Sequence, residues 1–212
     1  MPGMREKQIL GVILAGGAGR RFGADKRVAL LAGKPLLEWV IARAQPQVAT
    51  LVVNANAEIA IASHVDRLPD DAPREGPLAG ILAGLKRAEE DGYSHVATFA
   101  CDTPFFPRDT VAHLAEMLHG SRADYAVARC GPTVHRIIAL WPLTCRRKLA
   151  TAFSGGARSM RSIEACLSPA SADFPPEGGP DGDPFFNINT AADLQNAEEW
   201  LSKHSPESWL PI

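Results

Sequence analysis

Short apolar runs alternate along the chain with longer stretches in which apolar residues recur with a helical period. The first pattern predicts buried strands, and the second predicts amphipathic helices. Strand–helix alternation of this kind predicts an α/β fold, with a mainly parallel sheet and helices on both of its faces. The predicted strands cover residues 8–14, 50–54, 95–100, 125–129, 136–141 and 185–189, and the predicted helices cover residues 35–45, 77–91, 107–119, 143–153, 159–166 and 191–204.

Three segments with candidate ligand-binding residues each follow a separate predicted strand. A glycine-rich segment follows residues 8–14, Asn54 ends the second strand, and Asp102 comes just after the third. In open α/β sheets, ligands bind at the carboxyl ends of the strands. We therefore expect the three segments to meet in one crevice.

The glycine-rich segment, Leu14 to Lys26, reads LAGGAGRRFGADK. Its glycines let the backbone approach a ligand closely, because no Cβ intervenes. Backbone N–H groups at a strand end suit a phosphate, and Arg20, Arg21 and Lys26 add three positive charges. The segment therefore predicts a polyphosphate ligand. Its glycines are Gly16, Gly17, Gly19 and Gly23.

Two well-known phosphate loops are excluded by their spacing. A Walker A loop needs Gly-Lys followed by Ser or Thr, whereas Pro35 follows Lys34 here. The dinucleotide fingerprint needs a third glycine, and Phe22 occupies that position. The loop is therefore of a third kind.

Composition and charge exclude several classes of protein. The 212 residues are 46% hydrophobic and 22% charged, with a formal net charge of −2, which is typical of an ordinary globular protein. The charge argues against a general binder of nucleic acids or membrane surfaces. The sequence has neither a signal-peptide pattern nor an apolar run of about 18 residues. We expect a cytoplasmic protein that binds neither nucleic acid nor membrane.

The cysteines and the loops complete the predicted organisation. The four cysteines are scattered without a paired motif, so neither a zinc site nor a disulfide scaffold is indicated. Nothing marks a linker between two folded halves, so residues 1–204 are expected to form one domain, followed by a tail at 205–212. Residues 168–183 are rich in Pro and Gly and predict a surface loop.

Four polar residues suggest metal or ligand binding by their type and by their positions in the sequence. Magnesium prefers one or two carboxylates together with phosphate oxygens, so Asp102 at a strand end is the candidate metal ligand; an N-cap or Asx-turn role that introduces the next helix is the alternative. Asn54 offers an amide that could read a purine edge. Asn187 and Asn189 alternate on a predicted strand, so both are expected to face one side.

Six motifs of the chain resemble, in the same order, those of the molybdenum cofactor guanylyltransferase family of the nucleotidyltransferase superfamily. The resemblance covers most of the chain and implies a three-layer, Rossmann-like nucleotidyltransferase fold. It also implies that residues 1–120 bind GTP and residues 121–204 bind the pterin acceptor. The motifs are LAGGAGRRFGADK, GKPLLEWV, VVNAN, GPLAGILAGL, CDTPFFP and FFNINTAADL.

The resemblance implies roles for the charged residues of the first and fifth motifs. Lys26 would contact the triphosphate, and Arg20 or Arg21 would stabilise the leaving pyrophosphate. Asp102 would hold Mg²⁺, with Mn²⁺ as an alternative. Arg20, Lys26 and Asp102 are thus the expected catalytic residues.

The resemblance also implies positions that bind the base, the ribose–phosphate and the acceptor. In the family an aspartate before the GPLAG motif helps select guanine, and of Asp70 and Asp71 we favour Asp71. His135 precedes Arg136 where the family often has proline, which favours a structural role for this histidine. The remaining binding candidates are Leu14, Ala15, Gly16, Gly17, Arg21, Gly23, Asn54, Gly76, Gly80, Arg158, Asn187 and Asn189.

The expected reaction is transfer of GMP from Mg–GTP to molybdopterin, with release of pyrophosphate. A cytidylyltransferase acting on the same pterin is an alternative, although Ala15-Gly16-Gly17 follows the guanylyl pattern. A sugar-phosphate nucleotidyltransferase and a non-catalytic nucleotide-binding regulator are further alternatives; loss of Lys26 or Asp102 would have indicated the regulator, and both are present. Molybdenum-insertion proteins and molybdoenzyme chaperones are the implied protein partners.

Overall fold

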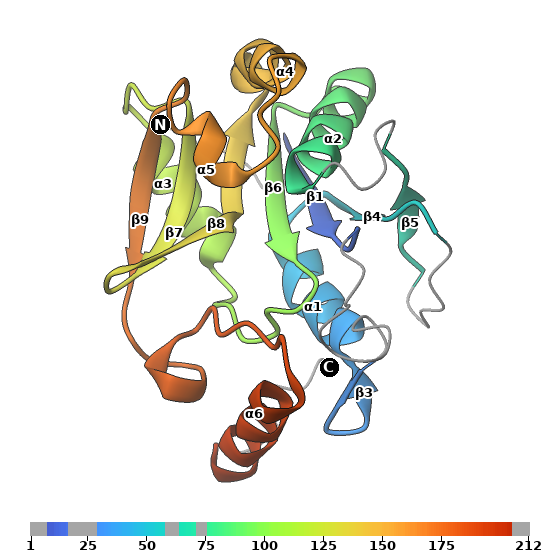
Figure 1. Ribbon diagram of the computed structural model, residues 1–212, viewed down its shortest axis with the longest axis vertical. Coiled ribbons are helices and arrows are strands. Elements are labelled where there is room, and N and C mark those ends of the chain that lie inside the picture. Colours follow the sequence, from blue (N-terminus) through green and yellow to red (C-terminus); the bar gives the residue numbers. More distant parts are fainter. Residues whose placement is uncertain (1–7, 17–28, 58–63, 71–75, 205–212) are drawn as a thin grey trace.

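The computed structural model describes residues 8–16, 29–57, 64–70 and 76–204. Within these residues, seven strands form one sheet with helices on both faces (Figure 1). All neighbouring strands are parallel except the two pairs that include β8. The mainly parallel α/β fold predicted from the sequence is therefore confirmed. Across the sheet the strands are β5 (Asp66–Leu68), β4 (Thr50–Asn54), β1 (Ile9–Leu14), β6 (His95–Ala100), β8 (Thr133–Pro142), β7 (Tyr125–Cys130) and β9 (Pro169–Phe174).

Alternate residues of the central strands enter two separate hydrophobic clusters. In β1, Ile9 and Ile13 pack with helices α1 (Leu36–Ala44) and α3 (Thr110–Leu118). Leu10 and Val12 point to the other face, towards α2 (Pro77–Asp91), α4 (Arg146–Ser154) and α5 (Met160–Ile163). Because successive side chains of a strand point to opposite faces, a strand covered on both sides must be apolar along its whole length.

A third cluster lies beyond the carboxyl edge of the sheet, where α6 (Ala191–Lys203) packs outside both helical layers (Figure 1). Its buried residues Ala197 and Leu201 meet Phe105 from the loop after β6 and Ile188 from the segment before α6. Helix α6 begins with a capping box between Thr190 and Asp193, which satisfies two N–H groups at its first turn. The helix also packs against the hairpin of β2 (Leu30–Leu31) and β3 (Lys34–Pro35).

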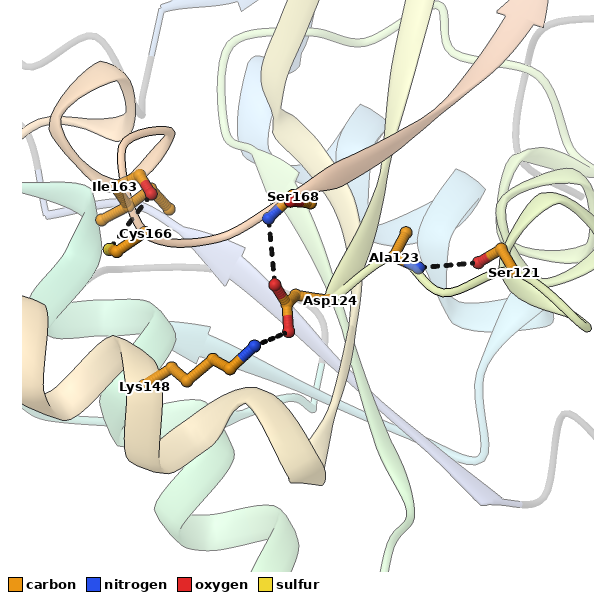
Figure 2. A network of polar contacts seen from close by, with 7 residues as sticks. All are labelled: Ser121, Ala123, Asp124, Lys148, Ile163, Cys166 and Ser168. Atoms are coloured by element: carbon orange, nitrogen blue, oxygen red, sulfur yellow. Dashed lines mark hydrogen bonds and ion pairs between the residues drawn. The ribbon is translucent and has the colours of Figure 1, made fainter.

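The C-terminal part of the sheet differs from the prediction. Residues 169–174 form strand β9, which pairs in parallel with β7, where a surface loop over 168–183 was expected. Asp124 begins this pairing, because its N–H donates to Ser168 O and its carboxylate accepts from Ser168 N–H and Lys148 Nζ (Figure 2). The β9 sequence PASADF begins with proline and is too polar to predict a strand by itself.

Three further segments differ from the prediction. Residues 185–189, expected as a strand, do not form one, because Asn187 and Ile188 bond to the turn at Asp102 instead of to a strand. The short edge strand β5 was missed because three residues carry too little pattern. The helix expected at 107–119 begins only at Thr110, after a turn closed on Pro107 O. Short 3₁₀ turns occupy Gln45–Gln47, Leu143–Cys145 and Pro180–Gly182.

Over the part of the chain that the structure describes, no helix has the length and apolar character needed to span a bilayer.

Candidate active site at the carboxyl edge of the sheet

The ends of four parallel strands bring the predicted polar residues together. In the sheet register, Leu14 of β1 lies beside Asn54 of β4 and beside Ala100 of β6. Asn54 in turn lies beside Leu68 of β5. The residues that follow these ends, up to Gly16 in the glycine-rich segment, therefore share one edge of the sheet.

Asn54 is a buried junction between β1, β4 and β5, with 3% of its surface exposed. Its carbonyl accepts from Ala15 N–H (3.0 Å), and its side-chain Nδ2 donates to Leu68 O (3.0 Å) and Asp70 Oδ2 (3.2 Å). Both partners of Nδ2 are acceptors, so only the NH₂ group of the amide fits that position. The two donors of Asn54 therefore hold the β5 end and Asp70, and a direct contact of Asn54 with a purine stays a prediction.

The glycine at position 80 in α2 is required by this junction. A Cβ there would overlap Asn54 Oδ1 and lie 2.8 Å from Leu14 Cδ2. Gly76, the residue before α2, has φ of +82°, and a Cβ would lie 2.7 Å from the carbonyl oxygen of Arg158. Both predicted pocket glycines thus allow close approach, one to Asn54 and the other to the segment between α4 and α5.

Asp102 lies in the turn after β6 and is bound by the segment that precedes α6. Its Oδ1 accepts from Asn187 Nδ2 (2.8 Å), and its carbonyl accepts from Ile188 N–H (2.9 Å). The next helix begins eight residues later, after Asp109, so the alternative role of Asp102 as a helix cap is wrong. The half-exposed carboxylate is held at the strand end by a segment 85 residues away in sequence.

The loop that follows Asp102 is anchored by buried polar side chains of α1 and the turn after it. Arg43 Nε donates to Phe106 O (2.7 Å), and Gln47 bonds to Pro107 O (3.1 Å) and Val111 N–H (3.0 Å). Burial, and to a lesser degree the charge of Arg108, lowers the pKa of Arg43 to about 10. Arg43 therefore stays charged at neutral pH. The sequence does not reveal this anchor, because nothing local distinguishes Arg43 and Gln47 from surface residues of a helix.

Asn187 and Asn189 are exposed on either side of the buried Ile188. The structure brings Asn187 to Asp102, whereas the N–H of Asn189 donates to Asp193 Oδ2 (2.8 Å) at the start of α6. Residues 187 and 189 are thus exposed about a buried residue without forming a strand, and a common direction of the two amides stays a prediction. Of the two, Asn187 is the one whose side chain bonds to the metal candidate Asp102.

Arg158 lies at the end of α4, beside Gly76. Its Nη1 donates to Phe153 O (2.6 Å) and Ala157 O (2.9 Å), and its guanidinium lies 4.4 Å from the centroid of the Phe153 ring. Phe153 O also accepts from Gly156 N–H (3.0 Å), so Arg158 adds a second bond to a carbonyl of the last helical turn. A contact of Arg158 with an acceptor phosphate stays a prediction.

His135 has a structural environment, in line with the role favoured from the sequence. Its Nε2 lies 3.3 Å from Asp183 Oδ1, and its ring lies 4.8 Å from that of Phe185, centroid to centroid. Burial alone would raise the pKa of Asp183, but the contact with His135 and the N–H of Phe185 outweigh it and lower the pKa. The contact ties the segment after β9 to β8.

Several predicted residues lie outside the described part of the chain: Gly17, Arg20, Arg21, Gly23, Lys26 and Asp71. Their roles stay predictions.

Among the described residues, no group of three or more His, Cys, Asp or Glu side chains could hold a metal. One carboxylate with phosphate oxygens and waters is nevertheless a normal magnesium environment, so Asp102 fits the predicted ion. The thiol of Cys145 is an ordinary buried one, because burial raises its pKa to about 12.

Comparison with known families identifies the class of protein that has this fold and site. The model of the MobA-like NTP transferase domain family matches residues 11–170, so the chain is a nucleotidyltransferase of this class. It is 39% identical over 198 residues to a molybdenum cofactor guanylyltransferase of Rhizobium meliloti (strain 1021), with 90% of each chain covered. The corresponding protein of Bradyrhizobium sp. (strain ORS 278) is 40% identical over 195 residues, with 89% of this chain and 91% of the relative covered.

The chain therefore belongs to the molybdenum cofactor guanylyltransferase family. The crystal structure of molybdopterin-guanine dinucleotide biosynthesis protein A from Archaeoglobus fulgidus has a similar fold. It aligns with a TM-score of 0.73 and 27% sequence identity, covering 92% of this chain and 99% of the other.

Proposed function

We propose that the protein transfers GMP from Mg–GTP to molybdopterin, giving molybdopterin guanine dinucleotide and pyrophosphate. The observation that carries the proposal is the half-exposed Asp102 carboxylate, held by Asn187 at the strand edge that also begins the glycine-rich segment. A phosphate-binding loop beside a single carboxylate suits a metal-bound triphosphate. Family membership supports GTP as the nucleotide and a molybdenum cofactor as the acceptor.

In the proposed reaction, an oxygen of the acceptor phosphate forms a bond to the α-phosphorus of GTP. The bond between the α-phosphorus and its bridging oxygen breaks, and pyrophosphate leaves with that bonding pair. Magnesium, held by Asp102, would supply positive charge to the triphosphate. Lys26 and Arg20 or Arg21 would add charge along the β- and γ-phosphates and stabilise the leaving group.

For base selection we propose Asp70 in place of Asp71. Asp70 is held at the carboxyl edge by Asn54, whose own side chain lies against Gly80 of α2. A carboxylate accepts hydrogen bonds from N1–H and the exocyclic amine of guanine, neither of which adenine offers in that arrangement. Since a carboxylate can accept about four hydrogen bonds, the bond from Asn54 is compatible with this role. The wrong base would leave buried polar groups unpaired.

For the acceptor we propose the C-terminal part of the single domain, residues 121–204. Its segment before α6 reaches Asp102 through Asn187, so an acceptor bound there would lie beside the nucleotide bound by residues 1–120. Arg158, Asn187 and Asn189 are the proposed contacts. We also propose a cytoplasmic location, with molybdenum-insertion proteins and molybdoenzyme chaperones as partners.

The test is a reaction of the purified protein with molybdopterin, Mg²⁺ and each nucleoside triphosphate in turn, followed by pyrophosphate release. GTP should give pyrophosphate and a guanine dinucleotide product, and omission of molybdopterin should stop the release. Equal or faster turnover with CTP would contradict the proposal in favour of a cytidylyltransferase. Turnover with a sugar phosphate in place of molybdopterin would contradict the proposed acceptor.

A further inference from the structure

The segment that holds Asp70 leaves the sheet after a very short edge strand. Strand β5 has three residues, and within the described residues it pairs only with β4. The last main-chain bond between the two strand ends runs from Ala55 N–H to Leu68 O (3.2 Å), and Pro69, the next residue, has no N–H to continue the ladder. Strand pairing alone therefore holds this segment weakly.

Two asparagine side chains continue the pairing where the main chain stops. Asn54 Nδ2 bonds to Leu68 O and to the carboxylate of Asp70, as described above. Two residues further along, Asn56 Oδ1 accepts from the N–H of Asp70 (3.1 Å). Arg67 Nη1 donates to the carbonyl of Asn56 (3.3 Å), so Asn56 is itself tied back to β5. Asn54 thus holds the carboxylate of Asp70, and Asn56 holds its backbone.

We infer that Asn56 is a positioning residue for guanine selection, acting through Asp70. The inference rests on the proposed function, in which Asp70 accepts two hydrogen bonds from the guanine edge. Such a pair of bonds requires the carboxylate to lie near the plane of the base, since hydrogen bonds weaken steeply with misalignment. A carboxylate on a weakly paired segment meets this requirement only when its backbone is fixed. Asn56 is exposed, so its removal should cost little stability.

The experiment measures GTP and ATP affinities by calorimetric titration in the presence of Mg²⁺, so it does not depend on transfer activity. Asn56→Ala should weaken GTP binding about threefold to tenfold and leave ATP binding within twofold, which lowers the GTP/ATP ratio. Asp70→Ala should lower the ratio further. In the double variant, Asn56→Ala should have no further effect on the ratio, because Asp70 is already absent.

Two more variants separate this role from general destabilisation. Asn56→Asp keeps an accepting oxygen at the same place, and its added charge should weaken both triphosphates alike, so the GTP/ATP ratio should stay within twofold of the parent. Asn196→Ala is the matched control, because Asn196 is a half-buried asparagine of α6 whose side chain donates to Asp181 and not to the segment that holds Asp70. It should leave both affinities unchanged.

Each other outcome overturns the inference. Asn56 does not act through Asp70 if Asn56→Ala leaves the GTP/ATP affinity ratio unchanged. The same conclusion follows if Asn56→Ala lowers this ratio equally in the presence and in the absence of the Asp70 side chain. If Asn56→Asp lowers the GTP/ATP affinity ratio as much as Asn56→Ala does, the hydrogen bond that Asn56 accepts is irrelevant to base selection. If Asp70→Ala itself keeps the ratio, the base assignment fails together with the inference, whereas GMP transfer to molybdopterin would still be judged by pyrophosphate release.

Discussion

At the scale of single residues, the site is made by side chains that hold one another. Asp102 is bound by Asn187, and Asp70 is bound by Asn54, so each carboxylate at the strand edge has an amide that fixes its direction. Gly80 makes room for the second pair. The direction of each carboxylate therefore depends on the amide beside it.

Replacement of Asp102 by alanine should abolish most of the transfer while the protein stays folded. The loss of a metal ligand should raise the barrier by about 3 kcal/mol or more, which is at least a hundredfold in kcat/KM. Steady-state kinetics with Mg–GTP and a thermal melt provide the measurement. Asp109→Ala is the control, because this exposed aspartate in the same loop makes no capping bond. Near-normal turnover of Asp102→Ala would rule out Asp102 as the metal ligand.

Replacement of Gly80 by alanine should weaken GTP binding by displacing Asn54. Alanine favours a helix by about 1 kcal/mol over glycine, but the overlap with Asn54 Oδ1 should cost about 1–3 kcal/mol. Gly84→Ala is the matched control in the same helix, because its Cβ would lie 2.8 Å from Val12 Cγ2, away from the site. Both variants should melt at a lower temperature, and only Gly80→Ala should bind GTP less tightly. Equal GTP affinity in the two variants would contradict the role of the junction.

At the scale of elements, the sheet is extended at its C-terminal side by a charged contact. Asp124 joins the start of β7 to the start of β9 and to Lys148 of α4 (Figure 2). Burial alone would raise the pKa of Asp124, but the bond from Lys148, the N–H of Ser168 and the charge of Lys148 outweigh it and lower the pKa. The ionised form of Asp124 therefore stabilises the folded state.

Replacement of Asp124 by alanine should destabilise the protein in a pH-dependent way. A lowered pKa in the folded state means that the contribution is present above the unfolded pKa, near pH 4, and is lost as the pH falls through the folded value. At pH 7 we expect a loss of about 1–2 kcal/mol in the free energy of unfolding, since Lys148 is largely exposed. Urea unfolding at pH 7 and below pH 4 should show the difference shrinking, and a constant difference would contradict the assignment.

The exposed pair of Arg129 and Asp173 provides the control for this measurement. It also joins β7 to β9, but both side chains are exposed to solvent. Asp173→Ala should therefore change stability much less than Asp124→Ala at pH 7.

At the scale of the whole molecule, the site is assembled from elements that are far apart in sequence. Strands β1, β4, β5 and β6 supply the edge, and the segment before α6 returns from the other end of the chain to reach Asp102. The third cluster holds this segment in place, because α6 packs on Phe105 of the Asp102 loop and on Ile188. An unfolded chain would hold none of these groups together.

Mg–GTP should therefore stabilise the folded protein strongly. A ligand that binds only the folded state adds about 2.7 kcal/mol at a concentration 100 times its Kd, and for a domain of this size that should raise Tm by about 5–10 °C. Thermal melts with GTP, ATP and CTP, each with and without Mg²⁺, provide the measurement. A rise with CTP as large as with GTP would contradict the proposed base selection.

Local sequence pattern was enough to predict several elements of the structure. A strand buried on two faces must be apolar along its length, so β1, β4 and β6 could be predicted with near-correct ends, as could α2. The same rule placed Asn54 and Asp102 at strand ends on one edge, because parallel strands end on the same side. The ordered motifs also indicated the family, since they are runs of neighbouring residues.

Only the tertiary structure decided which distant segments meet. The antiparallel insertion of β8 between β6 and β7, the pairing of β9 with β7, and the bond from Asn187 to Asp102 all join segments far apart along the chain. Their local sequences are compatible with loops or strands alike, because the deciding free energy comes from packing and hydrogen bonds formed after the chain has folded back. The direction of the Asn54 amide was decided in the same way, by acceptors on β5 that the sequence pattern does not reveal.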